Sequence, residues 1–239
     1  KHLNIKKNKK YYLGKKYQTS ITIPIFSQEK LEKIIRKFKN INFIKVKVNK
    51  NNILKTIIFI NKRCPKSKII IDANEGLNFI LLKKIIKDLE KLNVIIIEQP
   101  LKYGLDYKLK NIKTKILFCA DESFHIKNKN KILKYYQLIN LKLDKFGGLS
   151  KSLEIIKFLK RKNKKILLGC MVSSSLSIIP ALSLAKYCDF LDLDGAYFLK
   201  KDFKNGITYK DSNLLLNKNF ISLNKKGPQE NLEGLFKKI

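Results

Sequence analysis

Acidic residues are scarce in this 239-residue chain, which has 19 of them against 52 Lys and Arg and a formal net charge of +33. Such an excess of positive charge is typical of proteins that bind nucleic acid or an anionic surface. Arginine is nearly absent, however, with only Arg36, Arg63 and Arg161. Nucleic-acid readers rely on the planar fork of arginine. Because the lysines are also spread over the whole chain, we expect no nucleic-acid partner and keep a basic nucleic-acid binder as an alternative.

Several classes of site lack their motifs. The four cysteines form no CxxC pair and only two histidines are present, which argues against a zinc site or a disulfide framework and favours a reducing compartment. No GxGxxG or GxxxxGK[ST] motif indicates a nucleotide site. No signal peptide opens the chain, so we expect a cytoplasmic protein.

One long uncharged run raises the question of a membrane span. Residues 166–185, ILLGCMVSSSLSIIPALSLA, carry no charge over 20 positions, which is the length of a membrane helix. Five serines and Pro180 interrupt the run. We therefore predict a buried strand followed by a helix, and no membrane partner.

Short apolar segments recur at a steady interval and predict strands buried on both faces. Eight such segments are present: 19–23, 43–48, 68–72, 93–97, 115–120, 137–143, 165–170 and 190–194. Segments with helical spacing lie between them, at 27–39, 77–92 and 150–162. Alternation of strands and helices with short connections predicts an α/β fold with a parallel sheet, and eight units close into a TIM-like (β/α)7β barrel. An open doubly wound sheet is the alternative.

The domain boundaries follow from this pattern. Residues 1–17 are basic and polar and form a lead-in, and residues 18–199 form the barrel. Residues 200–239 form a short C-terminal extension, in which the alternation over 205–224 indicates a hairpin or a surface extension.

Ionisable residues stand at the carboxyl end of one predicted strand after another. These residues are Lys45, Lys47, Asp72, Glu98, Asp121, Lys142, Asp192 and Asp194. Chemistry in a parallel barrel is located at this end, and a charge buried there is unfavourable unless it is paired. The repetition therefore predicts one shared site.

The three acids Asp72, Glu98 and Asp121 come from consecutive strands, so their carboxylates should converge and repel each other. Each alone could cap the following helix, but a hard cation such as Mg²⁺ would remove the repulsion of all three. Lys47 and Lys142 flank the trio. A lysine near a dication should have a lowered pKa and act as a base, and this combination suits removal of a proton next to a carboxylate.

The ordered motifs KVKV, DANEG, EQP, ADES, NLKLDKFGGL, GCMVSSSLSI and DLDG resemble the enolase superfamily, muconate-lactonizing subgroup, over residues 11–224. They are most similar to dipeptide epimerases that act on L-Ala-D/L-Glu. The resemblance implies Mg²⁺-dependent epimerisation by α-proton abstraction and reprotonation through an enediolate. It makes Asp72, Glu98 and Asp121 the ligands of one Mg²⁺, and Lys47 and Lys142 the acid/base catalysts on opposite faces of the α-carbon.

The resemblance also assigns supporting roles. Lys45 would keep Lys47 deprotonated or orient the substrate carboxylate, and Asp192 and Asp194 would bind the α-ammonium group of the dipeptide. Residues 1–17 would be the remnant of a linker from a missing N-terminal capping domain, against which residues 200–239 would pack.

Other activities of this fold stay open. They are N-acylamino acid racemase, o-succinylbenzoate synthase and muconate cycloisomerase, together with an inactive truncated barrel. Whether the chain forms a homo-oligomer is also left open.

Overall fold

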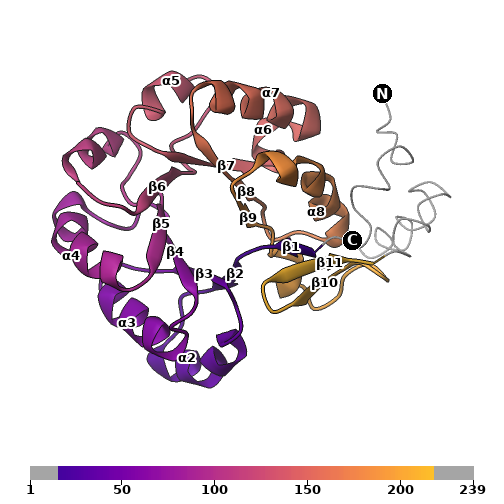
Figure 1. The fold of residues 1–239 in the computed structure, drawn as a ribbon, viewed down its shortest axis with the longest axis horizontal. Helices are drawn as coiled ribbons and strands as arrows, with labels where there is room; N and C mark the ends of the chain where they lie inside the picture. The colour runs from indigo at the N-terminus through magenta and orange to yellow at the C-terminus, as the bar shows by residue number, and fades with distance from the viewer. Residues whose placement is uncertain (1–15, 218–239) are drawn as a thin grey trace, which may run out of the picture.

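The computed structural model describes residues 16–217 and has an eight-stranded parallel sheet at its centre. The strands follow one another in chain order, and Figure 1 shows them as a ring with helices on its outside. They are β2 (Ile21–Ile23), β3 (Phe43–Lys47), β4 (Lys68–Asp72), β5 (Val94–Glu98), β6 (Leu117–Ala120), β7 (Leu138–Lys142), β8 (Lys165–Gly169) and β9 (Phe190–Asp192). Each overlaps one of the eight predicted segments.

The sheet curls into a nearly closed barrel. At the seam between β9 and β2, the backbone N–H of Ser20 donates to the carbonyl of Leu191 at 3.0 Å, and the N–H of Leu193 donates to Thr19 Oγ1 at 2.7 Å. The predicted TIM-like barrel is therefore confirmed, and the open sheet is excluded.

Helices follow the strands as the spacing indicated, although several are short. The long ones are α3 (Ile53–Arg63), α4 (Phe79–Lys91) and α7 (Gly148–Arg161), and the short ones are α2 (Gln28–Ile34), α5 (Lys129–Ile132), α6 (Leu143–Phe146) and α8 (Ser175–Ala181). Turns of 3₁₀ helix complete the outer layer: η1 (Ile35–Phe38), η2 (Asp106–Asn111), η3 (Leu182–Tyr187) and η4 (Gly195–Phe198). The Ser27 side chain accepts a hydrogen bond from the N–H of Lys30 and caps α2, as predicted.

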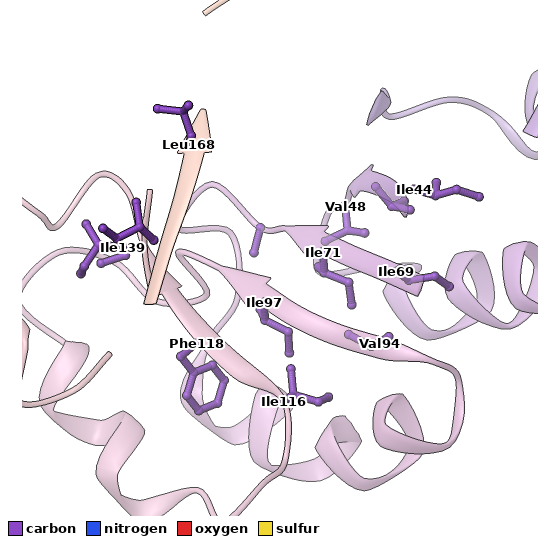
Figure 2. Close-up of a cluster of buried hydrophobic side chains, with 14 of the residues drawn as sticks. Ile44, Val48, Ile69, Ile71, Val94, Ile97, Ile116, Phe118, Ile139 and Leu168 are labelled. Atoms are coloured by element: carbon purple, nitrogen blue, oxygen red, sulfur yellow. The ribbon is translucent and has the colours of Figure 1, made fainter. Parts of the chain in front are cut away.

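Apolar side chains pack on both faces of the sheet, which explains the continuous apolar runs. Alternate residues such as Ile69, Ile71 and Phe118 belong to the large core between strands and helices (Figure 2). The residues between them point inward and fill the barrel interior. This inner cluster consists of Ile70, Ile96, Cys119, Leu138 and Leu167, and we call it the apolar layer.

A small antiparallel sheet lies beside the barrel (Figure 1). Its strands are β1 (Lys16–Gln18), β10 (Ile207–Lys210) and β11 (Asn213–Leu216), with β11 in the middle. β10 and β11 form the hairpin that the alternation indicated. Residues 1–15 and 218–239 lie outside the described residues, so the boundaries of the lead-in and the extension stay predictions.

The long uncharged run 166–185 is not a membrane helix. It consists of most of β8, the turn after it, α8 and the first residues of η3. Within residues 16–217 no helix combines the length and the apolarity that a membrane crossing requires.

Candidate active site

Lys45 lies at the centre of a group of buried carboxylates inside the barrel. Its Nζ is 2.7 Å from Asp192 Oδ2, 2.8 Å from Glu98 Oε2 and 3.1 Å from Asp72 Oδ2. All four side chains are at most 5% exposed. The three acids come from β4, β5 and the end of β9, so the ammonium group joins strands on both sides of the barrel seam.

The strand register explains this meeting. Lys45 and Lys47 are two residues apart on β3 and point to the same, inner face. Lys47 is the register partner of Asp72, and Asp72 is the partner of Glu98. Lys47, Asp72 and Glu98 therefore reach the interior at nearly one level, one step above the apolar layer, whereas Lys45 is the register partner of Ile70 within that layer.

A second group of charges lies closer to the mouth of the barrel. Lys47 Nζ is 3.2 Å from Asp72 Oδ2 and donates to Asn74 Oδ1 at 2.8 Å. On the other side, Lys142 Nζ is 2.6 Å from Asp121 Oδ2. The two predicted acid/base lysines therefore contact the first and the last of the three predicted metal ligands.

These charges line one open pocket of about 670 Å³ at the carboxyl end of the strands. Seven of the eight predicted site residues form its wall, and Glu98 lies fully buried beneath it. Met171, Val172 and Phe198 add exposed apolar surface to the wall. The pocket is thus large enough for a small molecule, with charged and apolar parts.

The electrostatics of the inner group are dominated by burial and by Lys45. Burial raises the pKa of Glu98 to about 8, against the opposing effect of Lys45 and with the help of Asp72 and Asp121. Burial would also raise the pKa of Asp72, but Lys45 and Lys47 outweigh it and hold that pKa below its usual value. For Lys45 burial would lower the pKa, yet Asp192, Glu98 and Asp72 hold it well above normal.

The outer pair behaves similarly. Burial works against both charges, but Lys142 and then Lys145 lower the pKa of Asp121, and Asp121 and Glu98 raise the pKa of Lys142. In the protein alone Lys142 is therefore a firmly charged ammonium group. The lowered lysine pKa that the sequence predicted would require the dication itself.

Asp192 and Asp194 lie at the end of β9 and just beyond it, and both line the pocket. Asp192 Oδ1 accepts a hydrogen bond from Ser20 Oγ at 2.5 Å, and Asp194 Oδ2 accepts one from the N–H of Thr22 at 2.7 Å. Burial, followed by the charge of Asp192, raises the pKa of Asp194 to about 7. The two acids therefore repel each other when both are charged, although Asp192 is also paired with Lys45.

Residues 16–217 contain no group of three His, Cys, Asp or Glu side chains arranged to hold a metal ion. Ammonium groups lie among the acids instead, with Lys45 against Asp72 and Glu98. The donor chemistry nevertheless fits a hard cation, because all three predicted ligands are carboxylates. In addition, Asp72 Oδ1 is buried without a hydrogen-bond partner. Asp72 and Asp121 therefore line one pocket with Glu98 buried beneath it, but the described side chains are not arranged as a metal site.

Four residues of the site were not singled out from the sequence. Asn140 Nδ2 donates to Glu98 Oε1 at 2.7 Å, and its position two residues before Lys142 could have placed it inside the barrel. Lys145 contacts Asp121, but it is one lysine among many. Asn74 follows a strand, where no periodicity predicts the direction of a side chain. Ser20 lies within the predicted strand 19–23, whose alternation places it on the same face as Thr22.

The space for Asn140 is provided by the neighbouring strand. Gly169 on β8 lies so close to the Asn140 amide that any added Cβ would clash with it. Glycine is required here by the close approach rather than by its backbone conformation.

Comparison with known proteins places this fold in a family. The family model described as "Enolase C-terminal domain-like" matches residues 28–217. The chain belongs to this family. The barrel and the predicted superfamily are thus confirmed by a match that covers most of the described residues.

Two curated relatives of this enolase-type barrel are named racemase and epimerase. An N-acetyl-D-glutamate racemase of Pseudoalteromonas sp is 37% identical over 206 residues, which cover 84% of this chain and 65% of the relative. The L-Ala-D/L-Glu epimerase of Escherichia coli (strain K12) is 34% identical over 174 residues, covering 72% of this chain and 54% of the relative.

Solved structures give the same picture of the enolase-type barrel. An L-Ala-D/L-Glu epimerase has a TM-score of 0.78 at 30% identity, covering 85% of this chain and 65% of that one. An enolase family member of Agrobacterium tumefaciens with homology to dipeptide epimerases, containing sodium and L-Ala-L-Glu, has a TM-score of 0.77 at 31% identity, with 85% and 63% covered. The chain thus spans between 54% and 65% of the length of these relatives.

Proposed function

We propose that this chain is the catalytic barrel of a Mg²⁺-dependent epimerase that acts on a dipeptide of the L-Ala-D/L-Glu type. The observation that carries the proposal is the placement of two lysines on opposite flanks of three acids. Lys47 contacts Asp72 and Lys142 contacts Asp121, with Glu98 on the strand between them. Both lysines line the same pocket.

Asp72, Glu98 and Asp121 would be the protein ligands of the cation. When bound, Mg²⁺ would stabilise the negative charge that develops on the substrate carboxylate as the α-proton leaves. The buried, unpartnered Asp72 Oδ1 and the hard oxygen donors of all three side chains support this assignment.

The two lysines would share the proton transfers. One takes the α-proton, which leaves an enediolate, and the other returns a proton to the opposite face. Lys142 is held as an ammonium group by Asp121, which suits it to donate. Lys47 is 40% exposed at the pocket wall, where a substrate could reach its Nζ. In the reverse reaction the two roles exchange.

Lys45 would act on Lys47 rather than on the substrate alone. Both ammonium groups contact the same oxygen, Asp72 Oδ2, at 3.1 and 3.2 Å. The two ammonium groups therefore share one acceptor, and the role of Lys45 in keeping Lys47 deprotonated or orienting the substrate carboxylate stays a prediction.

Asp192 and Asp194 would bind the α-ammonium group of the dipeptide. Their mutual repulsion contributes to the raised pKa of Asp194, and an incoming ammonium group would relieve it. The names of the Escherichia coli relative and of the solved epimerase support a dipeptide as the substrate.

A second candidate function is racemisation of an N-acylamino acid such as N-acetylglutamate. It is favoured by the 37% identity to an N-acetyl-D-glutamate racemase over 84% of this chain. An N-acyl substrate has no ammonium group, so Asp192 and Asp194 would then have no substrate charge to bind.

Exchange of the α-proton into D₂O, followed by NMR with Mg²⁺ present, tests the proposal. We expect exchange in the Glu residue of L-Ala-D-Glu and L-Ala-L-Glu, with the Escherichia coli relative as the positive control. Asp192→Asn and Asp194→Asn should each reduce it. Exchange with N-acetyl-D-glutamate alone would favour the second candidate, and no exchange with either substrate would contradict both.

We also propose a cytoplasmic location without a nucleic-acid partner. The location rests on the spacing of the four cysteines, which favours a reducing compartment.

A further inference from the structure

A buried polar network lies directly behind two of the proposed metal ligands. Gln99 follows Glu98 at the end of β5, is fully buried, and has a positive φ of 35°. A non-glycine residue in this conformation is strained by roughly 1–3 kcal/mol and persists only where its surroundings hold it. The contacts of its side chain supply that restraint.

The amide oxygen of Gln99 reaches across to the loop after β6. Gln99 Oε1 accepts hydrogen bonds from the N–H of Asp121 at 3.2 Å and from the N–H of Ser123 at 3.0 Å. Its backbone N–H also donates to the carbonyl of Cys119 at 2.8 Å. One residue, adjacent in sequence to Glu98, thus fixes the backbone of Asp121 on the next strand.

The Gln99 amide has one orientation, because two backbone N–H groups donate to its oxygen and the Leu101 carbonyl accepts from its nitrogen, which also contacts Tyr136 OH at 3.2 Å. Gln99 Nε2 donates to Ser123 Oγ at 2.7 Å and to the carbonyl of Leu101 at 2.9 Å. Ser123 Oγ in turn donates to Asp106 Oδ1 at 2.7 Å, and Tyr136 OH donates to the same oxygen at 2.6 Å. The chain of hydrogen bonds therefore ends on a carboxylate.

Asp106 is a buried acid that the proposed reaction does not use. It is 2% exposed, and its described donors are all uncharged: Ser123 Oγ, Tyr136 OH, the N–H of Gly104 and, at 3.4 Å, Gln99 Nε2. Burial, followed by Asp106, raises the pKa of Tyr136, so its hydroxyl remains a neutral donor. A buried carboxylate that is solvated only by neutral donors fixes the directions of those donors strongly.

We infer that Gln99, oriented by Asp106 through Ser123 and Tyr136, is a positioning residue that sets the spacing of the Glu98 and Asp121 carboxylates for the metal ion. The inference rests on the proposed function, because it takes these acids as metal ligands. Gln99 itself touches neither carboxylate. It acts through its own backbone, which follows Glu98, and through the backbone amides of Asp121 and Ser123 in the loop after β6.

The chain offers a control at the same strand, β6, with an exposed glutamine. Gln137 Oε1 also accepts a backbone hydrogen bond from β6, from the N–H of Phe118 at 3.1 Å. That bond lies near the opposite end of the strand, away from the ligands. Gln99→Leu and Gln137→Leu each remove a side-chain acceptor of backbone hydrogen bonds at one end of β6. Only Gln99→Leu should change metal binding.

The test is calorimetric titration of each variant with Mg²⁺ alone, without substrate. Gln99→Leu should bind Mg²⁺ roughly 10–100 times more weakly than wild type, the range seen when a group that orients metal ligands is removed. Gln137→Leu should bind like wild type. Tyr136→Phe keeps the ring and removes the hydroxyl that donates to Asp106 and accepts from Gln99 Nε2. It should give a smaller loss, and it keeps the test decisive if the Gln99 variant does not fold.

The outcomes separate this inference from the proposed function. Equal Mg²⁺ affinity in wild type, Gln99→Leu and Tyr136→Phe would overturn the inference, as would an equal loss in Gln137→Leu. Wild type that binds Mg²⁺ without exchanging α-protons would overturn the proposed function alone. Wild type that binds no Mg²⁺ would overturn both.

Discussion

Two layers of side chains fill the inside of the barrel, and they come from the same strands. Ile70, Ile96 and Leu138 belong to the apolar layer. Two residues further along each strand stand Asp72, Glu98 and Asn140, which with Lys45 and Asp192 form what we call the charged layer. The apolar layer and the charged layer are thus only two residues apart along the strands.

The difference shows that the apolar layer contributes mainly to stability and the charged layer mainly to the proposed chemistry. The apolar layer lowers the free energy of the folded state by burying hydrocarbon. The charged layer is compensated instead by ion pairs around Lys45, and buried ion pairs contribute little net stability. We therefore expect substitutions in the first to change the free energy of unfolding without changing metal binding, and substitutions in the second to change function.

The largest effect should come from the lysines at the edge of the charged layer. Lys47→Met and Lys142→Met each remove one proposed acid/base group, and loss of such a group slows proton transfer by about 10² to 10⁴. The α-proton exchange assay measures this directly. Lys151→Met, which removes an exposed lysine on α7, is the control and should exchange at the wild-type rate. If Lys47→Met and Lys142→Met both exchanged the α-proton at the wild-type rate, neither lysine would be an acid/base catalyst.

Lys45→Met should reveal what holds the charged layer together. Without its ammonium group Asp72, Glu98 and Asp192 are left buried without their common counter-ion, and breaking a buried pair in this way costs about 3–5 kcal/mol. Urea unfolding in the presence of EDTA measures the loss. A change below about 1 kcal/mol, the typical value for an exposed pair, would show that Lys45 does not balance these acids.

Ile96→Ala should weaken the apolar layer alone. Ile96 is fully buried, and truncating a buried isoleucine costs about 2–5 kcal/mol. The affinity for Mg²⁺, measured in the same preparation, should not change. If this variant lost metal affinity as strongly as a change in the charged layer does, the two layers could not be treated as separate.

The smallest effect concerns the pH dependence of stability through Asp194. Its pKa is raised to about 7 from the usual 3.8, so the folded state holds the proton more tightly than the unfolded state does. The corresponding stability is complete below pH 3.8 and is lost as the pH rises through 7. Asp194→Asn can keep the hydrogen bond from Thr22 and does not titrate.

Urea unfolding at pH 5 and pH 8 measures this effect. The stability of Asp194→Asn relative to wild type should increase by about 2.5 kcal/mol between the two values. An unchanged difference between the proteins would mean that Asp194 has an ordinary pKa.

Much of this arrangement follows from the sequence, because a strand has a period of two and parallel strands end at one edge. That rule alone placed Lys45 beside Lys47 and brought Asp72 to the level of Glu98. It could not predict that Lys45 would pair with Asp192, since that contact joins residues 147 positions apart. The contact depends on how the barrel closes, and closure is a property of the whole sheet.

Loops were less predictable than strands. Gln99 and Asn74 both have a positive φ, so neither side chain direction follows from the alternation of the preceding strand. The segment after β5 contains the 3₁₀ helix η2 rather than a full α-helix. Asp106 is the first residue of η2 and accepts hydrogen bonds from Tyr136 and Ser123. Such contacts depend on tertiary packing, which overrides local pattern.

The most direct test of the central claim is a crystal structure with Mn²⁺ in place of Mg²⁺, in which anomalous scattering locates the ion. The account predicts one ion with an oxygen of Asp72, of Glu98 and of Asp121 each within coordination distance, about 2.0–2.2 Å for a small hard cation. Lys47 and Lys142 should lie on either side of it. An ion bound by other residues would contradict the account. So would a structure at saturating Mn²⁺ in which no ion is bound and the lysine ammonium groups still contact the three acids.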